Sequence, residues 1–199
     1  MIKTIQQQTL PQRLSKIETK QLTSVTPELT QFTKDCEALG YNNNSNIKQM
    51  KWEWCMEIGG AWFATYDRNK IISISGIHPW LNGWRALFRG VQTQARPGLS
   101  RHHMSSYCFH SQLPLQIEWA KQNEKYRNPS IYITTNTETD QSGKMLRINK
   151  TFTHLERAGL VQNLGRAEVF ETIQNVWLLD IDRYTEIRES YDRIPKQRN

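Results

Sequence analysis

The chain has 199 residues, of which 37% are hydrophobic and 23% are charged, so we expect one folded domain over 1–199 and not a disordered chain. Its formal net charge of +7 and pI of about 9.4 favour anionic partners. No apolar run is long enough to cross a bilayer, and the first residues lack the apolar core of a signal peptide. We therefore expect a cytoplasmic protein.

The first half of the sequence predicts one helix followed by three strands. Residues 1–25 are rich in Gln, Thr and Lys, and we expect them to hold one strand and to be partly flexible. Thr26 as N-cap and Pro27 at the first helical position predict a helix over 27–39. The β-rich runs at 61–66 and 70–77 predict a hairpin, and a further strand is expected over 84–92.

The second half predicts helices that alternate with strands. The elements expected there are a helix over 99–122, a strand over 129–138, a helix over 143–158, two short strands within 168–181 and a helical tail over 182–199. Pro114 is expected to kink or split the first of these helices, because proline lacks a backbone N–H. The order of elements predicts an α/β (α+β) fold with a mixed sheet of six or seven strands.

The turn after the strand at 84–92 is suited to bind an anion. Pro97 fixes one backbone φ, and Gly98 allows a close approach to an oxygen atom. The N–H groups of Leu99, Ser100 and Arg101 would lie at a helix N-terminus, where anions bind, and the guanidinium groups of Arg96 and Arg101 would add charge-assisted bonds. The alternative is a solvated basic corner.

Metal binding and disulfide bonding are not indicated. The three cysteines lie far apart, at Cys36, Cys55 and Cys108. Their odd number and the absence of a CxxC pair predict small buried side chains. Three histidines lie near one another in the sequence, at His102, His103 and His110. Because no Cys or carboxylate joins them at ligand spacing, we expect no metal site.

From about residue 26 to residue 181 the chain resembles the GNAT N-acetyltransferase superfamily. The segments that carry the resemblance are "AWFATYDRNKII", "FRGVQTQARPGLSR", "SIYITTN", "RINKTFTHLERAGLV" and "TIQNVWLLD". They look like the family's hairpin, its central strand with the pyrophosphate loop, the strand that diverges from it, a helix that ends in glycine, and a late strand. The loop departs from the family pattern, since Gly98 comes one residue early.

The resemblance implies coenzyme A as the bound anion and acetyl-CoA as the cosubstrate. The pyrophosphate would lie on the turn already described, and the strand end Gly90, Val91 and Gln92 would supply a backbone N–H to the thioester oxygen. Asn136, at the end of the diverging strand, joins the expected cofactor-binding residues. The resemblance also predicts a mostly antiparallel central sheet flanked by helices.

The residues for proton transfer are less clear. The family often places a Tyr four residues before the glycine that ends the helix, where this chain has Leu155. The adjacent His154 lies on a different face of that helix, so a donor to the departing thiolate must come from elsewhere, for example Tyr107. His78 and Glu57 are the candidate bases, and for both a packing or surface role is the alternative.

The central strand carries two arginines, Arg85 and Arg89, on the same face. Buried guanidinium groups without carboxylates would be costly. They would therefore face a solvated cleft or bind an acidic acceptor, or they would pair with Glu53 and Glu57 across the sheet.

Three functions remain open at this stage. The first is an acyl-CoA-dependent N-acyltransferase that moves acetyl to an amine. The second is a basic single-stranded nucleic-acid-binding protein, supported by the charge and by interleaved aromatics such as Trp80, Trp84 and Phe88. The third is a non-catalytic protein of GNAT shape that binds CoA or serves in protein interactions.

Overall fold

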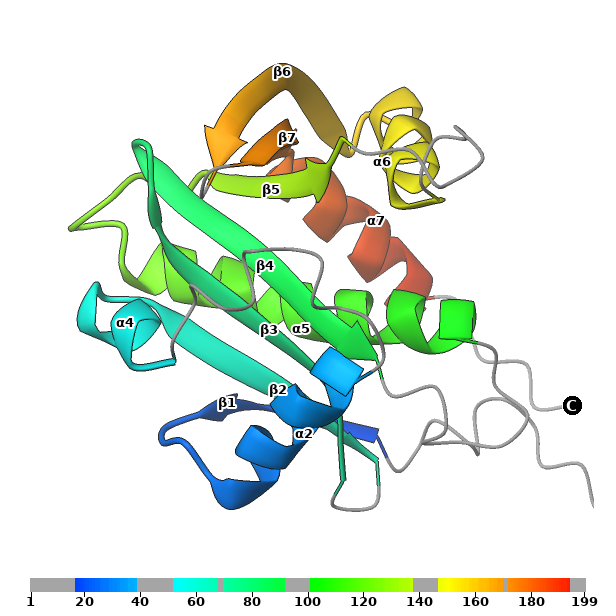
Figure 1. Ribbon diagram of the computed structural model, residues 1–199. Coiled ribbons are helices and arrows are strands. Elements are labelled where there is room, and N and C mark those ends of the chain that lie inside the picture. Colours follow the sequence, from blue (N-terminus) through cyan, green and yellow to red (C-terminus); the bar gives the residue numbers. More distant parts are fainter. Residues whose placement is uncertain are drawn as a thin grey trace, which may run out of the picture.

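The computed structural model describes the backbone of residues 17–38, 52–67, 70–91, 101–137, 147–169 and 172–193. Seven strands form one sheet in the order β1-β2-β3-β4-β5-β7-β6 (Figure 1). Their bounds are β1 Ile17–Leu22, β2 Ala61–Asp67, β3 Lys70–Trp80, β4 Gly83–Val91, β5 Ile131–Asn136, β6 Val161–Val169 and β7 Thr172–Leu179. Among the described strands, β4 and β5 alone pair in parallel. The predicted mixed, mostly antiparallel sheet is confirmed.

Helices cover both faces of this sheet. The helices described are α2 Pro27–Ala38, α4 Trp52–Glu57, α5 Arg101–Gln122, α6 Arg147–Arg157 and α7 Ile181–Arg193. Because successive side chains of a strand point to opposite faces, β2 divides its apolar residues between the two. Ala61 and Phe63 pack with α5, whereas Trp62 and Ala64 pack with α2 and α4.

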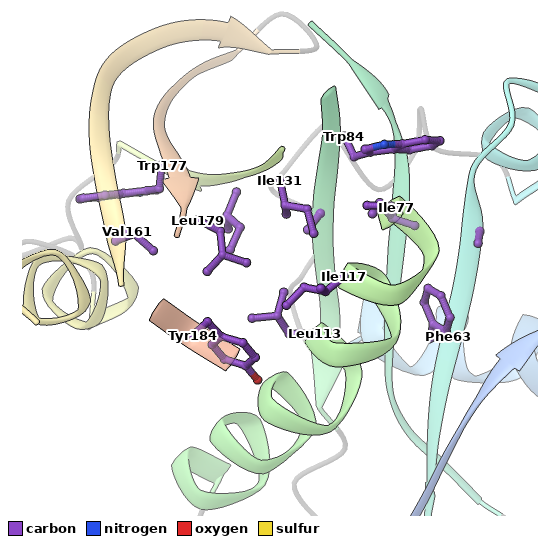
Figure 2. Packing of buried hydrophobic residues seen from close by; sticks show 14 of the residues in the cluster. Phe63, Ile77, Trp84, Leu113, Ile117, Ile131, Val161, Trp177, Leu179 and Tyr184 are labelled. Carbon is purple, nitrogen blue, oxygen red and sulfur yellow. The ribbon is translucent and has the colours of Figure 1, made fainter. Parts of the chain in front are cut away.

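The larger core lies under α5, α6 and α7 (Figure 2). Leu113 and Ile117 of α5 point toward the sheet, and Tyr184 of α7 belongs to the same cluster. The cluster includes residues from both members of the parallel pair, Trp84 of β4 and Ile131 of β5. Burial of this apolar surface therefore helps to hold β4 and β5 together where they are paired.

Most of the elements predicted from the sequence are present. The predicted helix at 27–39 is α2, which begins at Pro27 with the Thr26 hydroxyl accepting from the Leu29 N–H at 3.2 Å. The hairpin is β2–β3, and the strand expected within 1–25 is β1, residues 1–16 lying outside the described chain. The helix expected over 143–158 is described from Arg147.

Two predictions were wrong. The split expected at Pro114 does not occur, since α5 runs from Arg101 to Gln122 with the proline inside it and with Leu113 and Ile117 packed in the core; a kink at Pro114 stays a prediction. The strand expected near residue 168 instead starts at Val161. Almost all of its middle residues are exposed, so polar and apolar side chains do not alternate there. The short helix α4 was not predicted.

The contact between α4 and β3 gives a prediction at Gly60. A Cβ at this position would lie 2.4 Å from the Ile77 carbonyl oxygen and 2.6 Å from the Cys55 carbonyl oxygen and Sγ. Backbone atoms there must move, so we expect Gly60→Ala to lower the free energy of unfolding by about 1–3 kcal/mol, measured by urea denaturation.

The matched control for Gly60→Ala is its neighbour Gly59. A Cβ at Gly59 meets nothing within 4 Å, and the backbone φ of +84° is one that Asn tolerates. We expect Gly59→Asn to cost about 1 kcal/mol or less. Equal losses for the two variants would contradict the predicted contact.

Candidate functional site

The parallel strands β4 and β5 separate after a short paired segment. Their pairing consists of Trp84 with Ile131, Arg85 with Tyr132 and Ala86 with Ile133. Beyond these pairs β4 continues to Val91 and β5 to Asn136, and the two strands diverge (Figure 1). We call the space between these two strand ends the β4–β5 split. The resemblance to the GNAT family predicted such a separation between these two strands.

Both walls of the split are held by outer strands. β4 stays paired with β3 as far as Val91, and β5 stays paired with β7 as far as Asn136. Each wall can therefore keep its strand geometry without the other. The N–H and C=O groups that β4 and β5 would have exchanged face the split, where a ligand with amide groups could satisfy them.

A β-bulge lies in β4 beside the split. Ile74 of β3 is opposite Arg89, and the next residue, Ser73, is opposite Val91, so Gly90 has no partner residue on β3. A bulge bends its strand and leaves backbone groups outside the ladder. Gly90 and Val91, which the sequence predicts as donors to a thioester oxygen, thus belong to the wall of the split. Gln92 lies outside the described residues.

Arg85 lies at the closed end of the split, and its side chain is only 1% exposed. Its Nε and Nη2 donate to the Thr134 hydroxyl at 3.0 and 2.6 Å, and Nη2 also donates to Gln174 Oε1 at 3.2 Å. The expectation that Arg85 faces a solvated cleft is therefore wrong. Neutral side chains of β5 and β7 accept its hydrogen bonds, and sequence reasoning missed both Thr134 and Gln174.

The expected pairing of the arginines with glutamates is not seen where it can be examined. Glu57 is exposed at the end of α4, and among the side chains described no ion pair joins it to Arg85. The side chains of Glu53 and Arg89 lie outside the described part of the structure. The substrate-binding role predicted for Arg89 stays a prediction.

His78 pairs with Arg85 across β3 and β4. Its Nδ1–H donates to the Pro79 carbonyl at 2.9 Å, and its ring packs edge-on against Trp54 at 5.5 Å. Burial, with a smaller effect of the Arg85 charge, lowers the pKa of His78 to about 4. A buried imidazole of this pKa is a weak base, which argues against His78 as the group that deprotonates an ammonium ion.

Several predicted site residues cannot be placed. The pyrophosphate turn with Arg96, Gly98, Leu99 and Ser100 lies outside the described residues, and so do the side chains of Arg101, Tyr107 and Asn136. The backbone of Asn136 pairs with Gln174. Leu155, where the family often has Tyr, is half-buried against the main core, which is consistent with a packing role.

The described residues contain neither a metal-binding group nor a helix suited to cross a membrane. No group of three or more His, Cys, Asp or Glu side chains within them is arranged to hold a metal ion; the side chains of His102, His103 and His110 are not among them. None of the described helices combines the length and apolar character needed to span a membrane.

No protein-family model matches the chain, and no curated protein matches its sequence. Solved structures do match. A protein from Desulfovibrio desulfuricans, described as belonging to the GNAT acetyltransferase family, is 11% identical with a TM-score of 0.53 over 82% of this chain and 98% of that chain. The chain has the GNAT fold.

Two further structures share this GNAT fold. An aminoglycoside 6'-N-acetyltransferase solved with coenzyme A is 16% identical, with a TM-score of 0.50 over 81% of this chain and 95% of that chain. An N-acetyltransferase from Staphylococcus aureus is 12% identical, with a TM-score of 0.51 over 82% and 97%. At identities this low, structural similarity establishes the fold alone. The chemistry has to be argued from the residues of this chain.

The depressed pKa of His78 predicts how stability depends on pH. In the unfolded chain the pKa of His78 is near 6.5, whereas in the folded protein it is about 4. Between these pH values the unfolded chain therefore binds a proton that the folded protein does not. The unfavourable contribution of His78 to the free energy of unfolding is therefore small above pH 6.5 and grows as the pH drops toward 4. The loss from this group is on the order of 3 kcal/mol at most.

We expect the free energy of unfolding of the wild type to fall more steeply between pH 6.5 and 4.5 than that of His78→Gln. The Gln side chain does not titrate, so the variant lacks this one contribution while all other groups are shared. Urea denaturation at pH 7.0, 5.5 and 4.5 measures the difference. Parallel curves would show that His78 titrates normally.

Proposed function

We propose that the protein is an acyl-CoA-dependent N-acyltransferase that transfers acetyl from acetyl-CoA to an amine. The observation that carries the proposal is the β4–β5 split in a sheet of GNAT fold. The pantetheine arm of CoA is narrow and contains two amides, so it suits a slot lined by strand N–H and C=O groups. The N-acetyltransferase solved with coenzyme A supports the same interpretation.

In the proposed reaction the amine attacks the thioester carbonyl carbon, the C–N bond forms and the C–S bond breaks. A base takes one proton from the ammonium ion so that the neutral amine can attack. The nitrogen of the tetrahedral intermediate then loses a second proton, which restores the acid that protonates the leaving thiolate. The backbone at the Gly90 bulge would stabilise the oxyanion. The proposed base is Glu57 and the proposed acid is Tyr107. His78 is a poor base because its pKa is low.

A second candidate function is a GNAT-fold protein that binds CoA without catalysing transfer. Leu155 at the position of the family's Tyr favours this alternative, because an apolar side chain cannot protonate a thiolate. Acetylation assays with a panel of small amines and basic peptides would separate the two functions, since both include CoA binding.

The nucleic-acid alternative is disfavoured by the aromatic side chains. Single-stranded nucleic acid stacks on exposed rings, but Trp84 is buried in the core and Trp80 packs edge-on against Tyr132. The side chain of Phe88 lies outside the described residues.

Binding of CoA, measured by calorimetry, tests the proposal. We expect the wild type to bind, and Arg96→Ala and Arg101→Ala each to weaken binding roughly 10- to 150-fold through the loss of one charge-assisted bond. Gly98→Val should also weaken binding, because it places a Cβ where a phosphate oxygen must approach. The melting temperature should change little.

The control ligand is a single-stranded oligonucleotide at two salt concentrations. Oligonucleotide binding that falls steeply with salt, together with no CoA binding by the wild type, would contradict the proposed function. Unchanged CoA affinity in all three variants would show that the turn is a solvated corner.

We propose that the amine acceptor is acidic. Arg89, which stands on the wall of the split, is then expected to bind it. Arg89→Ala should raise the KM for the acceptor and leave CoA affinity nearly unchanged. Equal loss of both would indicate a structural role for Arg89.

A further inference from the structure

One buried side chain connects three strands where the β4–β5 ladder ends. Arg85 belongs to the second of the three paired positions, and the last is Ala86 with Ile133. Thr134, which accepts two of its hydrogen bonds, is the first residue of β5 beyond that ladder. Gln174, which accepts another, belongs to β7, the strand that holds β5 from the other side.

The chemistry of arginine suits this position. Its guanidinium group is planar and always charged, and its donors have a fixed geometry, so two acceptors bound to it are held at a defined separation. Removing a guanidinium group from water is costly, and here charge-assisted hydrogen bonds to a hydroxyl and an amide offset part of that cost. The hydrogen bonds of this side chain reach past the last backbone pair to the next residue of β5.

We propose that Arg85 is a positioning residue that sets the separation of β4 and β5 for the pantetheine arm of acyl-CoA. It does so by fixing Thr134 and Gln174 relative to β4. This inference rests on the proposed function. It requires that loss of the Arg85–Thr134 hydrogen bonds weakens CoA binding more than an equivalent loss elsewhere on β5.

The same strand offers a matched control. Tyr132 Oη donates to Asn82 Oδ1 at 2.6 Å, and Tyr132 precedes the split, within the paired segment. Tyr132→Phe thus removes one side-chain hydrogen bond from β5 within the paired segment, as Thr134→Val removes hydrogen bonds just beyond it. Both substitutions nearly preserve side-chain shape.

The experiment measures CoA affinity by calorimetry and melting temperature for the wild type, Thr134→Val, Thr134→Ser and Tyr132→Phe. We expect Thr134→Val to weaken CoA binding roughly tenfold or more, because it removes both charge-assisted hydrogen bonds that Thr134 accepts from Arg85. Thr134→Ser keeps the hydroxyl and should restore the affinity, and Tyr132→Phe should change it less than about twofold. A weakening by Thr134→Val no greater than that by Tyr132→Phe overturns the inference.

A double-mutant cycle distinguishes an effect of Thr134 through Arg85 from direct contact between Thr134 and CoA. If Thr134 acts through Arg85, then Arg85→Met should weaken CoA binding as Thr134→Val does, and the double variant should be no worse than either single variant. Additive effects overturn the inference. If Arg85→Met does not fold, Gln174→Leu, which removes the other acceptor of Arg85, takes its place in the cycle and should weaken CoA binding as Thr134→Val does. Failure of the wild type to bind CoA overturns the proposed function itself.

Discussion

The parallel ladder between β4 and β5 ends after three pairs, and the candidate site depends on that early end. Unpaired backbone groups inside a protein are costly, so two strands stay apart only if each is supported independently. Here β3 supports β4 and β7 supports β5. A bulge at Gly90 interrupts the register of β4 with β3 beyond the ladder, and Arg85 bridges the strands at the point where they part.

The two faces of the sheet contribute differently. Under α5, α6 and α7 the paired ends of β4 and β5 contribute apolar side chains, including Trp84, Ile131 and Ile133, to the main core. On the opposite face the same strands carry Arg85 and Thr134. Alternation along a strand produces this division. Apolar burial in the main core thus holds the closed end of the split, while the polar side chains of β4 and β5 lie on the opposite face.

The sequence predicted the elements that carry their own local signals. The cap at Thr26 and the hairpin between β2 and β3 are examples, and the glycine after α6 is another. The edge strand β6 was placed too late because its exposed residues do not alternate in polarity. The buried state of Arg85 could not be predicted, since its partners Thr134 and Gln174 lie 49 and 89 residues away. Long-range polar partners leave no periodic pattern in a sequence.

Backbone amide hydrogen exchange with and without CoA tests the central claim most directly, because it reports on the strands that form the split. The account predicts slower exchange on CoA binding in β4 over 87–91 and in β5 over 134–136, with no change in the ladder between β1 and β2. Saturating CoA that leaves both segments unchanged, or that slows exchange only in β1 and β2, would contradict it.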